Sequence, residues 1–278
     1  MATVTVIPPE KLLGNGEIAG GVFSWGDYAH HYLAEGDSWF SLSDILSPSF
    51  LYRFGSHVPL GQRTLIVNCA YPGDTLARMV DWSKNQHFPK LLHDKKFGWA
   101  WDGILLSAGG NDIIDAALEP AGILQSCAQP GSYRDFINPA AWDAFKYYLE
   151  QYFRYFVALR DSSEIIGNRS IPILYHSYGY PTPRNAPASI AGPWLYRAFT
   201  QKNIPESHWA ALSDALMDDL AELLRDFRTT GTNLKLIDTL KYVALNRADA
   251  TDNGDWLNEI HLNNSGKDKI ARYWAQFL

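Results

Sequence analysis

The stretch HYLAEGDSWF, residues 31–40, sets the expectation for the whole fold. Its apolar first half ends at Gly36, a residue that permits a sharp turn, and Ser38 follows two positions later. Residues 41–46 are expected to begin a helix, which would place Ser38 at a sheet edge beside helix-terminal N–H groups. Such donors stabilise a developing oxyanion. A serine that only caps a helix is the alternative interpretation.

Four more short runs are apolar on both sides of the pleat, as buried parallel strands are. These runs cover residues 64–68, 103–107, 171–176 and 234–238. Between them, apolar residues recur at three- and four-residue steps, which predicts amphipathic helices over 141–160, 206–227 and 266–277. The alternation predicts an α/β fold in which helices sandwich a central parallel sheet of about five strands.

Composition favours one folded unit. We expect a single domain over residues 1–278, with residues 1–28 as a candidate extension that packs on it. Hydrophobic residues make up 46% of the chain and aromatic residues 14%, which is enough for a large core. The two cysteines, Cys69 and Cys127, exclude a disulfide framework. A net charge of −6 gives no reason to expect a nucleic acid partner.

The sequence says little about the compartment. The first residues lack the basic stretch and apolar core of a signal peptide. No apolar run reaches the ~18 residues that a transmembrane helix needs, so none is expected. Cytoplasmic location and export without a leader both stay open.

Ligands bind beyond the carboxyl ends of parallel strands, so the loops after the predicted strands hold the candidate site. Gly73, after the second strand, can bring a backbone N–H close to a ligand, although a plain turn glycine is the alternative. After the third strand, Asn111 offers a neutral side-chain donor, which stabilises an oxyanion without titrating. Its alternative is an Asx-turn that caps a helix from Ile113.

His261 lies beyond the fifth predicted strand and precedes the last helix. An imidazole there can take the proton of Ser38 and later give it to a leaving group. A lone histidine is more often a surface or capping residue. Here four separate post-strand loops each supply one required part, and this coincidence favours catalysis.

The pattern resembles the SGNH hydrolase family, the GDSL-like lipases and esterases. The segments that match its four blocks are 36–38 (Gly-Asp-Ser), Gly73, 110–112 (Gly-Asn-Asp) and His261, in that order. The resemblance spans about residues 31 to 275. It implies a flavodoxin-like three-layer α/β/α sandwich and ester hydrolysis without metal or cofactor.

The same resemblance assigns roles to residues. It implies Ser38 as nucleophile, His261 as base, and an oxyanion hole from the Ser38 and Gly73 backbone N–H groups plus the Asn111 side chain. The substrate would be a small-molecule, lipid or glycan ester. Two alternatives remain at this point: a weak or inactive binding module on the same fold, and a transacylase that uses the same residues.

One position departs from the family pattern, which usually has aspartate three residues before the histidine. Here that residue is Asn258, which can accept a hydrogen bond but supplies no negative charge. Asp255 and Glu259 are nearby carboxylates, and a backbone carbonyl could also orient the ring. Glu259 is the weaker candidate because it alternates away from His261 in an extended segment.

Other features complete the expectation. His30 and His31 lack a third spaced ligand, so no metal site is predicted. The glycines lack nucleotide-binding spacing. The Pro- and Gly-bearing stretches 126–138 and 180–204 follow the third and fourth strands, so we expect them to border the site and set substrate size. The oligomeric state cannot be predicted.

Overall fold

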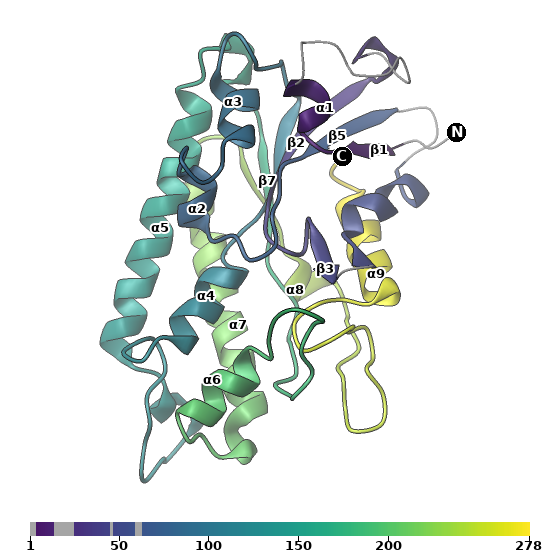
Figure 1. Cartoon of the computed structure of the whole chain (residues 1–278). Helices are drawn as coiled ribbons and strands as arrows, with labels where there is room; N and C mark the ends of the chain where they lie inside the picture. Colours follow the sequence, from purple (N-terminus) through teal and green to yellow (C-terminus); the bar gives the residue numbers. More distant parts are fainter. Residues whose placement is uncertain (1–3, 14–24, 45–46, 59–62) are drawn as a thin grey trace.

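The computed structural model describes residues 4–13, 25–44, 47–58 and 63–278 (Figure 1). At its centre is a six-stranded sheet in the order β1-β5-β2-β6-β7-β8, with every neighbouring pair parallel. The strands are β1 (Val4–Ile7), β2 (His30–Gly36), β5 (Thr64–Asn68), β6 (Gly103–Ser107), β7 (Ile173–His176) and β8 (Leu234–Ile237).

All five strands expected from the sequence are present, and the α/β prediction is confirmed. The sixth strand, β1, was not expected from the sequence. Val4–Ile7 is an edge strand paired in register with Thr64–Val67 of β5, so this segment belongs to the sheet. Residues 1–3 and 14–24 of the expected extension lie outside the described residues.

Helices cover both faces of the sheet, which gives the expected three layers. In Figure 1, α2, α3, α4, α5 and α7 lie on one side and α9 on the other. The helices are α1 (Glu10–Leu13), α2 (Leu76–Val80), α3 (His87–His93), α4 (Gly110–Leu118), α5 (Pro139–Asp161), α6 (Leu195–Gln201), α7 (Trp209–Asp226), α8 (Thr239–Tyr242) and α9 (Asn264–Trp274). None of the helices in the described part of the chain is long and apolar enough to cross a membrane.

The long helix α5 shows how sequence produces this layer. The Asn138 side chain accepts from Ala141 N and caps the first turn, and Pro139 occupies a position where no N–H is needed. The apolar residues at three- and four-residue steps, Trp142, Phe145, Leu149, Phe153 and Phe156, are buried. Burying each such side chain contributes about 1.5–3 kcal/mol.

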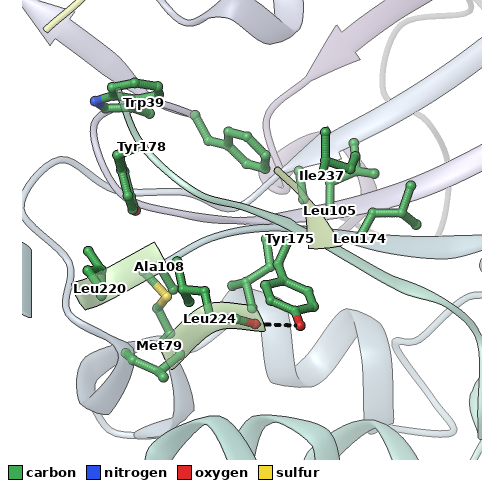
Figure 2. Packing of buried hydrophobic residues seen from close by; sticks show 14 of the residues in the cluster. Trp39, Met79, Leu105, Ala108, Leu174, Tyr175, Tyr178, Leu220, Leu224 and Ile237 are labelled. Carbon is green, nitrogen blue, oxygen red and sulfur yellow. Dashed lines mark hydrogen bonds between the residues drawn. The ribbon is translucent and has the colours of Figure 1, made fainter. Parts of the chain in front are cut away.

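Core packing on this side links α5, α7 and the sheet. The rings of Phe153 and Phe227 stack with centroids 4.4 Å apart, and Phe153 also contacts Tyr175 of β7. Figure 2 shows the hydroxyl of Tyr175 donating to the carbonyl of Leu224 on α7, at 2.9 Å. This bond satisfies the one polar atom that Tyr175 brings into the core.

The helix expected over residues 41–46 is wrong for residues 41–44, and residues 45–46 lie outside the described residues. Leu42–Asp44 forms the short strand β3, which pairs antiparallel with β4 (Ser47–Pro48). Only one helical turn forms after β2, in which the N–H groups of Phe40 and Ser41 donate to the carbonyl of Asp37. Ser38 therefore lies in an isolated turn and not at the start of a helix.

Candidate active site

Three chemically capable side chains meet at the carboxyl edge of the sheet. Ser38 follows β2, Asn111 lies in the first turn of α4 after β6, and His261 precedes α9. Ser38 and His261 are buried. The first and third expected blocks border one pocket of about 400 Å³, open mouth included. Its lining is mostly apolar: Asp37, Ser38, Trp39, Gly110, Asn111, Ile114, Tyr178, Gly179, Pro181, Met217, Trp256 and Ile260.

The hydroxyl of Ser38 lies 2.8 Å from Nε2 of His261, across 223 positions of sequence. On the other side of the ring, Nδ1 lies 3.0 Å from Oδ1 of Asn258. That oxygen also accepts from the backbone N–H groups of Ile260 and His261. These N–H donors identify the atom as the amide oxygen, so the proton of the ring resides on Nδ1. Nε2 is then free of a proton and can accept from Ser38.

The carboxylates of Asp255 and Glu259, the alternatives to Asn258, bond to groups other than the His261 ring. Asp255 accepts from Lys269 Nζ at 2.6 Å, Ser265 Oγ at 2.7 Å and Asn246 N at 2.6 Å. Burial alone would raise the pKa of Asp255, but these hydrogen bonds outweigh it and hold the pKa below its ordinary value. The carboxylate thus anchors the loop before His261 to α9. Asn258 is the side chain that the structure places against the imidazole.

Glu259 holds the rim of the site, a role that the sequence did not suggest. Its carboxylate accepts from the backbone N–H groups of Trp194, Tyr196 and Arg184. Burial raises the pKa of Glu259 to about 7, although these N–H groups oppose the rise. The ring of Trp194 meets His261 edge to face, with centroids 5.2 Å apart. The contacts span more than 60 positions of sequence, so no local signal could have revealed them.

The expected rim segments differ in their outcome. The stretch 180–204 borders the site through Pro181, which lines the pocket, and through Trp194. No residue of 126–138 is among the described residues that line this pocket. That stretch instead packs beside α7, where Arg134 pairs with Asp219 at 2.8 Å.

The loops that carry Gly73 and Asn111 are tied together. Nδ2 of Asn111 donates to the carbonyl of Asp74 at 3.0 Å, which leaves its second amide proton for another acceptor. Gly73 is exposed, has a φ of +82°, and is not among the residues that line the pocket. Beside them, the buried carboxyl of Asp112 accepts from Leu76 N, and burial raises its pKa to about 7.

Asp37 holds the turn that presents Ser38. One carboxyl oxygen accepts from Trp39 N at 2.9 Å, and the other accepts from the hydroxyl of Tyr178 at 2.5 Å. Trp39 in turn donates through Nε1 to the carbonyl of Ile260, next to His261. Figure 2 shows Trp39 and Tyr178 side by side at one end of the core. The sequence contained no signal that Tyr178 is a partner of Asp37.

Among the described residues, no group of three or more His, Cys, Asp or Glu side chains could hold a metal ion. The arrangement that is present consists of a serine, a correctly protonated imidazole and nearby amide donors. In serine hydrolases, groups of this kind catalyse acyl transfer from an ester carbonyl placed next to the serine.

Comparison with known proteins agrees with the fold and identifies the family. The sequence pattern of the GDSL-like lipase/acylhydrolase family matches residues 13–274, nearly the whole chain. The chain therefore belongs to this family, a family of hydrolases, as the four blocks predicted. No curated protein sequence matches the chain.

Solved structures show the same fold at low sequence identity. The chain is similar to the lipase Lip_vut3 from a goat rumen metagenome, with 15% identity, a TM-score of 0.56 and coverage of 89% of this chain and 96% of that one. It is also similar to a Streptococcus pneumonia protein provisionally described as a platelet activating factor. That match has 12% identity, a TM-score of 0.55 and coverage of 92% and 85%. The expected three-layer fold is confirmed.

The buried carboxyls predict how stability depends on pH. Burial raises the pKa to about 6 for Asp37 and to about 7 for Asp112 and Glu259. Between pH ~4 and ~7 the folded chain therefore binds more protons than the unfolded chain, so the free energy of unfolding should fall as pH rises. Urea unfolding at pH 5.5 and 8 measures this, and we expect a loss of several kcal/mol, at ~1.4 kcal/mol per unit of pKa difference.

Asp112→Asn tests the source of this slope. The variant keeps an oxygen acceptor and removes one titrating group, so the slope should become shallower. Asp143→Asn is the matched control, because the side chain of Asp143 is 71% exposed. An Asp112→Asn variant with the wild-type slope would show that Asp112 is not the group that titrates.

Proposed function

We propose that the protein hydrolyses carboxylic esters, with Ser38 as nucleophile and His261 as general base. The 2.8 Å contact between Ser38 Oγ and His261 Nε2 is the observation that supports this most directly. Oγ attacks the ester carbonyl while its proton passes to Nε2. The tetrahedral intermediate then expels the alcohol, which takes that proton, and leaves an acyl group on Ser38. Water repeats both steps and releases the acid.

Asn258 is proposed to orient the imidazole. Its amide oxygen fixes the Nδ1–H tautomer, which a base must have to accept a proton at Nε2. The amide supplies no charge for the imidazolium that forms during reaction. We therefore expect orientation without the electrostatic part of the usual aspartate contribution.

The oxyanion hole is proposed to consist of the Asn111 side chain with the backbone N–H groups of Ser38 and Gly73. The bond from Asn111 to the Asp74 carbonyl holds the amide in place and joins its loop to that of Gly73. A donor that is fixed before reaction stabilises the developing charge without reorganisation.

The pocket supports a compact apolar acyl group as the part of the ester bound there. Its walls include Trp39, Ile114, Met217 and Trp256, and the polar residues Ser38 and Asn111 lie where the carbonyl must sit. The alcohol would leave toward the rim near Trp194. An alcohol acceptor in place of water would make the same site a transacylase.

Ser38→Ala should abolish ester hydrolysis and leave the fold intact, because Ser38 supplies the attacking atom. Loss of such a residue typically lowers kcat by several orders of magnitude. The measurement is turnover of p-nitrophenyl esters of increasing chain length, together with fluorophosphonate labelling. Ser163→Ala is the control, since Ser163 is also buried but donates to Leu92 O far from the site. Equal labelling of wild type and Ser38→Ala would favour a binding module.

Asn111→Ala should lower kcat by roughly 10²–10³, the usual effect of losing one oxyanion donor. KM should change much less, because the charge develops in the transition state. Steady-state kinetics separates the two parameters. A variant with raised KM and unaltered kcat would place Asn111 in ground-state binding.

Asn258→Asp should keep or raise kcat, because a carboxylate near the imidazolium favours it. Asn258→Ala should lower kcat, since it removes the amide oxygen that lies 3.0 Å from Nδ1 of His261. In every active variant the rate should fall at acid pH, as His261 must be neutral to accept a proton. Wild-type kcat in Asn258→Ala would mean that the amide does not orient the ring.

A further inference from the structure

A second serine and a second histidine lie behind the Ser38 turn. The hydroxyl of Ser107, at the end of β6, lies 2.7 Å from Oδ1 of Asp37 and 2.9 Å from Nε2 of His176, at the end of β7. Nδ1 of His176 lies 2.8 Å from the carbonyl of Ser177. Ser107 and His176 are completely buried, and Asp37 is 2% exposed. None of these contacts is used by the chemistry proposed for Ser38 and His261.

Counting hydrogens shows that the hydrogen-bonded chain of Asp37, Ser107 and His176 needs one more proton than these side chains carry in their ordinary ionisation states. The Ser177 carbonyl can only accept, so Nδ1 of His176 carries a proton and Nε2 of the neutral ring is an acceptor. An ionised Asp37 is also an acceptor only. The single hydroxyl proton of Ser107 would then have to satisfy two acceptors, and one contact would set lone pair against lone pair. One added proton gives a donor to the contact of Ser107 with Asp37 and to its contact with His176; the Tyr178 hydroxyl lies farther from Ser107, at 3.4 Å.

Burial decides where that proton resides. Five aromatic side chains surround the ring of His176: Trp39, Phe40, Phe50, Tyr178 and Trp274. Burial lowers the pKa of His176 to about 4 and raises that of Asp37 to about 6, so Asp37 holds the proton in preference to His176. Asp37 then donates to Ser107, and Ser107 donates to His176.

The other titratable groups near Asp37, Ser107 and His176 do not supply this proton. The hydroxyl of Tyr178 already donates to Oδ2 of Asp37, and burial raises the pKa of Tyr178 well above its ordinary value. Asp112 on α4 is a second buried carboxyl, and its charge and that of Asp37 repel each other. This repulsion also favours the protonated form of Asp37. On the far side of Ser38, His261 faces Asn258.

We propose that Asp37, Ser107 and His176 form a buried proton-holding chain that positions the nucleophile turn, with one proton shared along it in the active state. Because Asp37 also accepts from Trp39 N and its own N–H donates to the carbonyl of Ser107, the chain fixes the turn that carries Ser38. Loss of the proton to solvent as pH rises breaks one contact and loosens the turn. These three are positioning residues, and the idea rests on the proposed role of Ser38.

The kinetic test is the pH profile of kcat for His176→Gln. In the wild type, kcat should rise as His261 becomes neutral and should also fall toward alkaline pH, by up to about tenfold, as Asp37 loses the shared proton. The two titrations overlap because the pKa of Asp37 is about 6, and tenfold is about the factor that one lost buried hydrogen bond represents. In His176→Gln the amide can donate to Ser107, so ionised Asp37 no longer leaves an unmatched contact. The alkaline fall should disappear while KM stays within about twofold.

Two further variants keep this test decisive. Ser107→Ala removes the shared hydroxyl and should also abolish the alkaline fall, even if His176→Gln does not fold. Tyr175→Phe is the matched control, because it removes a buried hydrogen bond from the same strand outside the chain. It should lower stability and keep the alkaline fall. Wild-type pH profiles in both His176→Gln and Ser107→Ala would overturn the proposal.

A spectroscopic test needs no activity. Infrared difference spectra between acid and alkaline pH should contain a protonated-carboxyl band that Asp37→Asn weakens, while the contributions of Asp112 and Glu259 remain. In His176→Gln, the Asp37 component of this band should vanish at a lower pH than in the wild type. A wild-type band unchanged by Asp37→Asn would show that Asp37 holds no proton. This result would overturn the proposed proton-holding chain, whatever role Ser38 has. Conversely, an inactive protein that keeps the band would contradict only the proposed ester hydrolysis.

Discussion

Gly36 meets Ser107 where the ends of β2 and β6 lie side by side, and there is no room between them for a side chain. A Cβ on Gly36 would lie 2.8 Å from both the Cβ and the carbonyl oxygen of Ser107. The close approach lets Asp37 N donate to the Ser107 carbonyl and lets the two side chains bond at 2.7 Å. The direction in which Ser38 leaves the sheet therefore depends on the absence of one carbon atom at position 36.

The remaining loops around the site are held in place by hydrogen bonds from one loop to another. Trp39 bonds to the carbonyl of Ile260, Asp112 bonds to the N–H of Leu76, and Asn111 bonds to the carbonyl of Asp74. Each bond joins segments that follow different strands or helices. Loops alone are the mobile part of such a fold, and these ties give the candidate site a fixed geometry without regular structure. Burial among these segments raises the pKa values of several carboxyls near the site, although the hydrogen bonds that the carboxyls accept oppose the rise.

The sequence predicted most of the sheet and much less of the site geometry. Four of the five expected strands were short, continuous apolar runs whose limits differ from the structure by no more than one or two residues, because burial on both faces leaves a strong signal. The strand at Val4–Ile7 was missed because its alternating pattern is short, and the helix at 41–46 was wrong because the turn closes on Asp37 after one turn. The local sequence pattern therefore could predict neither the strand at Val4–Ile7 nor the absence of the helix.

The block residues were predictable because each follows a strand, and parallel strands end at one edge. Their partners were not. The hydrogen bonds of Tyr178 to Asp37 and of residues 194–196 to Glu259 join segments that are distant in sequence. No periodic pattern in the sequence indicates these partners. The choice of Asn258 over Asp255 was also beyond the sequence, since it depends on Lys269 of α9 neutralising Asp255.

Asn258 lies in a part of the molecule that already contains buried carboxyls. Asp37, Asp112 and Glu259 each have a pKa raised by burial, and Glu259 is the next residue in the chain. Nδ2 of Asn258 is buried and has no hydrogen-bond partner among the described residues. An aspartate would put a second oxygen there, and an unpaired buried carboxylate oxygen costs more than an unpaired amide N–H. The amide keeps the orientation of His261 through Oδ1 and avoids another buried charge. At this position, stability of the folded state and stabilisation of the imidazolium therefore favour different residues, and this chain has the one that favours the fold.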